Sequence, residues 1–331
     1  MSPDGTTGSA NGKVILLGEH AVVYGGSAIA AGIDRGARAT LRVLPRGDCS
    51  QLSLGDRTLV ADPTGDDLAR AFAALLARFE APPVMVVAES DLPAGGGLGS
   101  SAALGVAIAR AVEGLDATSN GPPLDRVLAR ARAWEEIFHG APSGIDTAAA
   151  AHGGCFRFSR ADGVRPLALA RDLWLCIGDS GRGSSTRAMV EGVARTAERK
   201  PELFRTTMEG IERLVANAAL ALEAGDLGAV GSLMNLNQML LAGLMLSTET
   251  IETLCAAARG AGALGAKLTG AGGGGSVVAL TPSARAGAES VDDDEARRAA
   301  EAIVDSWRRA GLDGFVTRVR PTRPAPIPEE P

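Results

Sequence analysis

The chain has 331 residues, enough for two domains of ordinary size, and its 46% hydrophobic and 22% charged residues are ordinary for a globular protein. The formal net charge of −6 argues against nucleic acid as a main partner, although it allows a local basic pocket for a phosphorylated ligand. No apolar run reaches the length of a membrane span, and the polar residues 1–10 resemble neither a signal peptide nor an anchor, so no membrane contact is expected.

The cysteines are spaced too widely for a CxxC pattern and have no companion histidines. We expect them to be buried free thiols, which suits a protein of the reducing cytoplasm. They are Cys49, Cys155, Cys176 and Cys255.

The first half of the chain is expected to contain both strands and helices, after a flexible start at 1–10. The pattern predicts a hairpin or loop at 46–56 and a break at 120–123. The predicted strands are 13–17, 39–44, 84–88 and 155–158, and the predicted helices are 66–79, 102–113 and 124–138.

A turn cluster at 159–164 indicates a domain boundary, which divides the chain into domains 1–165 and 166–320. In the second domain the order of strand, helices, two strands, helix and strand fits a split βαβ plan. The proline-rich tail 321–331 is expected to be disordered. The predicted strands are 173–177, 266–268, 276–280 and 315–319, and the predicted helices are 187–199, 201–223, 226–245, 248–260 and 294–310.

The glycine–serine stretch at 91–103 lies between a predicted strand and a predicted helix. Unpaired backbone N–H groups and the helix dipole make such a turn an anion site, typically for phosphate. A tight turn with an N-capping serine is the alternative. The stretch is not a Walker A motif, because its lysine is missing, so another residue or Mg²⁺ must supply the cation.

Two carboxylates are candidate site residues: Glu135 on the predicted 124–138 helix and Asp146 after it. Glu135 shares an apolar stripe with Leu128 and Phe138, whereas Glu136 falls on the more polar face. A carboxylate on an apolar stripe must be paired or metal-bound, so Glu135 is a candidate metal ligand, with a buried ion pair as the alternative. Asp146 follows a Pro-Ser-Gly turn and is a candidate active-site carboxylate or a helix cap.

Three further segments are candidate site elements. Glu19 and His20 end an apolar strand, where a pocket and a surface turn are both compatible with the sequence. The glycine run 270–275 satisfies GxGxxG, but a predicted strand follows it, which argues against a dinucleotide site and favours close backbone approach or a mobile hairpin. The segment 183–187 could cap a helix or donate to a ligand.

The ordered set GKVILLGEHAVVYGG, LPAGGGLGSSAA, HGAPSGID and KLTGAGGGGS resembles the galacto-, homoserine-, mevalonate- and phosphomevalonate-kinase (GHMP) superfamily. The GEHAVVYG and HGxPSGxD strings resemble its mevalonate branch. The resemblance implies an α+β two-domain fold, with an N-terminal ribosomal-protein-S5-like domain, a C-terminal ferredoxin-like split βαβ domain and ATP in the cleft between them. It also implies transfer of the γ-phosphate of ATP to the primary hydroxyl of mevalonate.

The resemblance also implies a role for each matching residue. Asp146 and Lys13 would be catalytic, and Ser101 and Glu135 would hold Mg²⁺. The ATP phosphates would be held by Pro93, Gly95, Gly96, Gly97, Leu98, Gly99, Ser100, Ser101 and Ala102. The substrate side would be formed by Lys13, Glu19, His20, Ser143, Asp146, Thr186 and Gly272.

Some features of the sequence leave alternatives open. Ala141 and Thr147 stand where many relatives carry asparagine, and 181–185 diverges from some of them, which puts fine substrate contacts in doubt. The alternatives are a kinase for phosphomevalonate or a sugar, a nucleotide-binding relative without activity, and, least favoured, a Rossmann dehydrogenase. Because relatives are often homodimers, a homodimer is expected.

Overall fold

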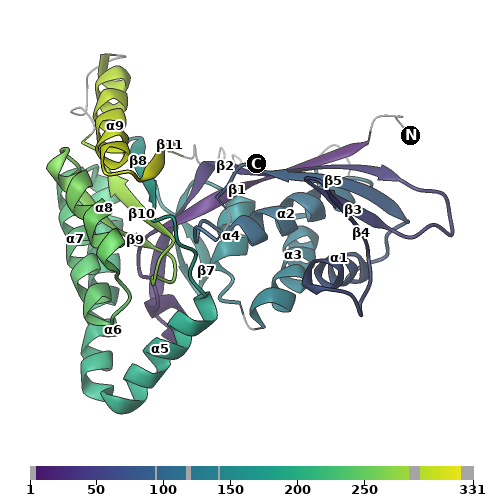
Figure 1. Ribbon diagram of the computed structural model, residues 1–331, viewed down its shortest axis with the longest axis horizontal. Helices are drawn as coiled ribbons and strands as arrows, with labels where there is room; N and C mark the ends of the chain where they lie inside the picture. Colours follow the sequence, from purple (N-terminus) through teal and green to yellow (C-terminus); the bar gives the residue numbers. More distant parts are fainter. Residues whose placement is uncertain (1–4, 94, 117–120, 141, 283–290, 322–331) are drawn as a thin grey trace, which may run out of the picture. The chain divides into compact units, whose positions relative to one another are not determined.

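The structure is a computed structural model and describes residues 5–93, 95–116, 121–140, 142–282 and 291–321 (Figure 1). The chain forms two compact units, each built from three segments. The first unit is made of the described residues of Met1–Val14, Gly32–Gly153 and Gly183–Ala188, and the second of those of Ile15–Ala31, Gly154–Arg182 and Met189–Pro331. Residues 322–331 of the predicted tail 321–331 lie outside the described residues.

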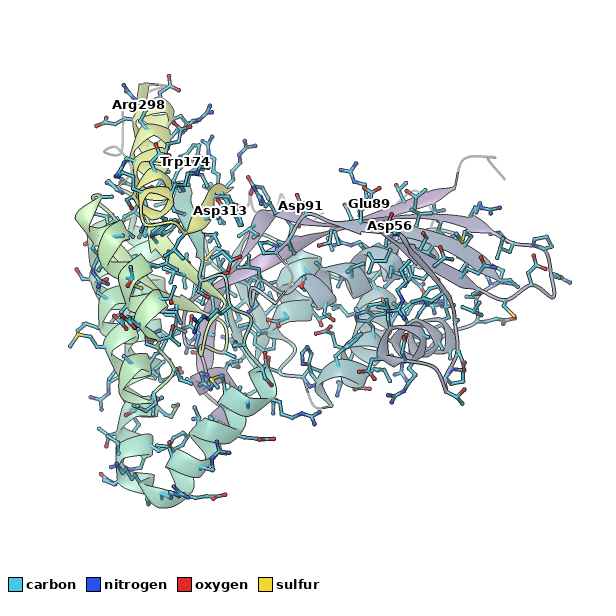
Figure 2. The ribbon with its side chains drawn as sticks, viewed as in Figure 1. Asp56, Glu89, Asp91, Trp174, Arg298 and Asp313 are labelled. Carbon is cyan, nitrogen blue, oxygen red and sulfur yellow. The ribbon has the colours of Figure 1, made fainter. Side chains whose placement is uncertain are left out.

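In the first unit, helices cover one face of a sheet. Strand β5 pairs antiparallel with β2 and parallel with β3, and β3 pairs with β4. Figure 1 shows α1, α2 and α3 on one side of these strands, and Figure 2 shows Glu89 and Asp91 on the other side. The elements are β1 (Thr6–Leu17), β2 (Ser27–Val43), β3 (Gln51–Leu54), β4 (Arg57–Val60), α1 (Asp67–Ala77), β5 (Val84–Ser90), α2 (Ser100–Glu113), α3 (Leu124–His139) and α4 (Ile145–His152).

Strands β1 and β2 run through both units, and β2 pairs with β6 within the second. The second unit also contains a four-stranded antiparallel sheet of order β11-β8-β10-β9. Its further elements are η1 (Ala21–Tyr24), β6 (Cys155–Ser159), β7 (Gly163–Pro166), β8 (Leu173–Asp179), α5 (Thr186–Arg199, which begins in the first unit), α6 (Pro201–Ala224), α7 (Leu227–Gly243), α8 (Glu249–Gly260), β9 (Gly265–Thr269), β10 (Ser276–Leu280), α9 (Val291–Arg309) and β11 (Asp313–Val319).

The order of these elements confirms the split βαβ plan. The long helices α6, α7 and α8 lie between β8 and β9 in the chain, and α9 lies between β10 and β11. Trp307 of α9 is fully buried and donates from Nε1 to the carbonyl oxygen of Leu254 at 2.8 Å. This hydrogen bond links α9 to α8. The Trp307 ring also packs on the sheet, because a Cβ atom at Gly178 of β8 would lie 3.1 Å from its Cδ2 and one at Gly314 of β11 would lie 2.6 Å from its Cε3.

Several strands were not predicted because their residues are small or polar. The predicted flexible start is wrong from Thr6 onward, and β2 has 17 residues where 39–44 was expected. A Cβ atom at Gly36 of β2 would lie 1.9 Å from the carbonyl oxygen of Ala10 in β1. Glycine in this strand thus reflects close packing of two backbones rather than a turn. The hairpin expected at 46–56 forms farther along, between β3 and β4.

Candidate functional site

The glycine–serine loop connects β5 to the N-terminus of α2 and is tied to β1. The backbone N–H of Lys13 donates to the carbonyl oxygen of Leu98 at 2.9 Å. Gly99, with φ of 73°, is the N-cap of α2, and a Cβ atom there would lie 3.0 Å from Cγ of Lys13. No side chain caps this helix start, so the alternative of an N-capping serine is wrong. The first N–H groups of α2 therefore have no intrahelical partner and stay available to an anion.

Lys13 and Asp146 form an ion pair beside this loop. Nζ of Lys13 lies 3.1 Å from Oδ1 of Asp146, and the lysine is 4% exposed whereas the aspartate side chain is 37% exposed. Asp146 lies in the first turn of α4, whose N-cap is Gly144, so the alternative that Asp146 caps this helix is wrong. A Cβ atom at Gly99 would lie 3.9 Å from Cβ of Asp146, which places the pair next to the loop.

Ser101 and Glu135 bring a second carboxylate to the start of α2. The Ser101 hydroxyl donates to Oε1 of Glu135 at 2.5 Å and accepts from Nε1 of Trp134 at 3.2 Å. Glu135 is 2% exposed, whereas Glu136 is exposed and pairs with Arg132 at 2.9 Å. The predicted separation of the two glutamates by helical spacing is therefore confirmed. Trp134 was not identified from the sequence, because an aromatic residue on a helix is usually a core residue.

Burial raises the pKa of the Glu135 carboxyl to about 7, and the hydrogen bond from Ser101 opposes this change. The cationic residue nearest in its own helix is His139, whose Nε2 lies 3.8 Å from Oε2 and is charged only if protonated. The alternative of a tight structural ion pair is thus weakened. The charge of Asp146 also raises the pKa of Glu135, and that of Lys13 lowers it. A buried carboxylate whose ion-pair contact is a histidine at 3.8 Å is suited to receive a cation from outside the chain.

The described residues contain no group of three or more histidine, cysteine, aspartate or glutamate side chains that could hold a metal ion. Ser101 and Glu135 nevertheless offer hard oxygen donors within 2.5 Å of each other. This set fits Mg²⁺, which is commonly bound by one or two carboxylates together with water and substrate phosphates.

Two other predicted residues lie in the same unit. Ser143 is partly buried and directly precedes the N-cap of α4. Thr186 is exposed and begins α5. It follows Gly183, whose Cα atom would lie 3.6 Å from a Cβ atom at Gly95, so the segment 183–186 starts beside the glycine–serine loop.

Glu19, His20 and Gly272 belong to the second unit, where they are buried. Glu19 forms an ion pair with Lys267 and accepts from Nδ2 of Asn237 at 3.0 Å. His20 has φ of 61°, and its Nε2 lies 2.9 Å from the carbonyl oxygen of Ala271. Gly272 begins a close approach, because a Cβ atom there would lie 2.5 Å from the carbonyl oxygen of Leu246.

Lys267 and Asn237 were not predicted as site residues. The signal for Lys267 was present, since a lysine inside the short apolar strand β9 needs a buried partner. Asn237 gave no such signal. The sequence left two alternatives for Glu19 and His20, a pocket and a surface turn. An exposed surface turn is excluded, because both side chains are buried.

Comparison with known proteins gives two family matches and many relatives. Residues 67–154 match the family model "GHMP kinases N terminal domain", and residues 218–311 match "GHMP kinases C terminal". Mevalonate kinase of Methanothermobacter thermautotrophicus is 38% identical over 278 residues, which cover 84% of this chain and 90% of that protein. Mevalonate kinase of Aeropyrum pernix is 35% identical over 318 residues, covering 91% and 93%.

The fold agrees with these matches. The crystal structure of L. major mevalonate kinase in complex with R-mevalonate is similar with a TM-score of 0.77 and 29% identity, covering 98% of this chain and all of that one. Both domain models and relatives above 30% identity over most of the chain thus agree on one family. The chain belongs to the GHMP kinases and, within them, to the mevalonate kinases.

Proposed function

We propose that the chain transfers the γ-phosphate of ATP to the primary hydroxyl of mevalonate, giving 5-phosphomevalonate and ADP. The observation that carries the proposal is the Lys13–Asp146 ion pair beside the glycine–serine loop, in a chain that belongs to the mevalonate kinases. The loop supplies backbone N–H groups for phosphates, and the pair supplies a carboxylate and a cation next to them.

Phosphoryl transfer passes through a loose transition state, so positioning and charge neutralisation matter more than a strong base. The substrate oxygen forms the new bond to phosphorus while the bond to the ADP oxygen breaks. Asp146 accepts or orients the hydroxyl proton, and Lys13 neutralises charge on the transferred phosphoryl group. Partial exposure of Asp146 suits a carboxylate that must reach a substrate, whereas burial of Lys13 fixes the position of its charge.

Mg²⁺ is the expected cofactor, and Ser101 and Glu135 would hold it. Bound there with the ATP phosphates, it would supply positive charge that stabilises the developing negative charge. The proposal is supported by the 2.5 Å separation of the two oxygen donors and by the burial of Glu135.

We further propose Glu19, His20, Ser143, Thr186 and Gly272 as the substrate side. The ATP site is proposed to be formed by the glycine–serine loop residues Pro93, Gly95, Gly96, Gly97, Leu98, Gly99, Ser100, Ser101 and Ala102.

Among the described helices, none combines the length and apolar character needed to cross a membrane. A cytoplasmic location is proposed from the widely spaced free cysteines. A homodimer is proposed by analogy with relatives, and light scattering that gives the mass of a single chain would refute it.

A substrate panel tests the function. The purified chain is incubated with ATP, MgCl₂ and one acceptor at a time, and ADP is measured with a coupled assay. We expect the highest kcat/KM with mevalonate. Higher values with phosphomevalonate or a sugar would assign the chain to another GHMP activity, and nucleotide binding without turnover of any acceptor would indicate a non-catalytic relative.

A further inference from the structure

The strongest unassigned feature is a fully buried ion pair in the second unit. Lys267 of β9 and Glu19 have no exposed surface, and their side chains are in direct contact. One carboxylate oxygen of Glu19 accepts from Lys267, and the other accepts from Nδ2 of Asn237 at 3.0 Å. Both oxygens of the carboxylate are therefore held by the protein.

This pair is one of four hydrogen-bonded links between the described segments 15–20 and 267–271. The ammonium of Lys267 also donates to the carbonyl oxygen of Ile15 at 3.5 Å. The backbone N–H of Ile15 donates to Oγ1 of Thr269 at 2.8 Å. His20 Nε2 lies 2.9 Å from the carbonyl oxygen of Ala271. Lys267, Thr269 and Ala271 thus alternate along one stretch of chain and fasten the end of β1 and the turn after it. Two motifs far apart in the sequence form a single structural module.

The links fix the side chain of His20 as well as that of Glu19. A carbonyl oxygen can only accept, so Nε2 of His20 must carry the proton, and Nδ1 is an acceptor in the neutral ring. Burial lowers the pKa of His20, which is consistent with a neutral imidazole. Within the part of the chain that the structure describes, Nδ1 has no hydrogen-bond partner. A hydroxyl group of the acceptor substrate would supply the missing donor.

His20 also adopts a backbone conformation that residues other than glycine rarely take, with φ of 61°. Such a conformation persists only where the surrounding contacts determine it. Lys267, through Glu19, and Ala271, through the imidazole, provide contacts on both residues of this turn.

We propose that Lys267 is a positioning residue for the acceptor substrate. It holds the Glu19 carboxylate, and with it the 18–20 turn, in the geometry that binds the acceptor, and it does so without touching the substrate. The inference rests on the proposed function, in which Glu19 and His20 belong to the substrate side of the site.

The test compares Lys267→Met, Glu19→Gln and the double variant, with Lys200→Met as the matched control. Met has a similar length to Lys but carries no charge. Lys200 is exposed, so Lys200→Met removes the same charge from the surface of the protein. For each variant kcat and the KM values for mevalonate and ATP are measured, together with the thermal unfolding midpoint. We expect Lys267→Met to raise the mevalonate KM by about tenfold or more while the ATP KM changes by less than about twofold.

The double variant separates positioning from simple stability. If Lys267 acts through Glu19, its removal has no further effect on the mevalonate KM once Glu19 is Gln, so the effects of the two single changes are not additive. The double variant also has no unpaired buried charge. Its mevalonate KM can therefore be compared with that of Glu19→Gln even if Lys267→Met does not fold.

Three results would overturn the inference. They are an unchanged mevalonate KM in folded Lys267→Met, additive effects in the double variant, and a parallel rise in both KM values. Wild-type chain that does not phosphorylate mevalonate is a different outcome, because it overturns the proposed function itself and the inference with it.

Discussion

The carboxylate of Asp146 stands 3.1 Å from a lysine ammonium that is almost fully buried. Replacing it by the isosteric amide in Asp146→Asn keeps the shape but removes the proton acceptor and the charge partner of Lys13. We expect kcat to fall by about 10²- to 10⁴-fold while ATP affinity stays nearly unchanged. Steady-state kinetics and ATP titration measure both. Asp125→Asn, the same change in the exposed first turn of α3, is the control, and equal turnover of the two variants would contradict the assignment.

Glu135 and Glu136 are neighbours whose environments differ. Glu135 is buried against the Ser101 hydroxyl, whereas Glu136 pairs with Arg132 on the surface. Glu135→Gln should weaken the apparent Mg²⁺ affinity by about tenfold or more, because the amide oxygen is a poorer ligand than a carboxylate. The measurement is activity as a function of MgCl₂ at saturating ATP. If Glu135→Gln and Glu136→Gln give the same Mg²⁺ curve as wild type, Glu135 has a structural role instead.

The residues of the site differ in how much the sequence says about them. Helical spacing alone separates Glu135 from Glu136, because one turn of a helix has a fixed geometry. The pairing of Lys13 with Asp146 depends on how β1 and α4 pack, so only the family resemblance indicated it. No local pattern predicts that Trp134 donates to Ser101 or that Lys267 pairs with Glu19, since such contacts are formed by tertiary packing.

At the scale of elements, the glycine–serine loop depends on a close approach at Gly99. Its φ is 73°, and a Cβ atom would lie 3.0 Å from Cγ of Lys13. Gly99→Ala should cost about 1 kcal/mol through the left-handed backbone alone and should also displace Lys13 or the loop. We expect a higher KM for ATP and a lower kcat.

Gly55→Ala is the matched control for this change. Gly55 lies in the β3–β4 turn with φ of 58°, and the space where its Cβ atom would lie is open. It should show a similar loss of stability with normal kinetics. If Gly99→Ala also keeps normal kinetics, the loop does not need this approach to hold the phosphates.

The elements that the sequence predicted best have a strong hydrophobic period. The helices at 124–138, 201–223 and 248–260 are observed at α3, α6 and α8, with ends shifted by a residue at most. The strands β1 and β2 were largely missed, because glycine and alanine fill positions where two backbones or a helix come close. A Cβ atom at Gly8 would lie 2.1 Å from the carbonyl oxygen of Ala107 in α2, so glycine is needed there for close packing. Judged by residue propensity alone, the same glycine indicates a flexible start.

At the scale of the whole molecule, the two units carry different cysteines. Cys49 is exposed in the first unit, whereas Cys155, Cys176 and Cys255 are buried in the second. Burial raises the pKa of the Cys155 and Cys255 thiols from 9.0 to about 12 and raises that of Cys176 as well. The three buried thiols are therefore reporters of the second unit alone, because only its opening exposes them and restores an ordinary pKa.

A thiol reagent such as DTNB, used at pH 8, should modify one thiol of the native chain quickly, and Cys49→Ser should abolish that fast phase. The rise from 9.0 to about 12 lowers the thiolate fraction of Cys155 and Cys255 at this pH by about a thousandfold, and burial blocks access as well. In rising urea the other three thiols should become reactive together, in the transition that unfolds the second unit. Three slow thiols that react one at a time in native buffer would contradict a cooperatively folded second unit, because each would then be exposed by a separate local opening.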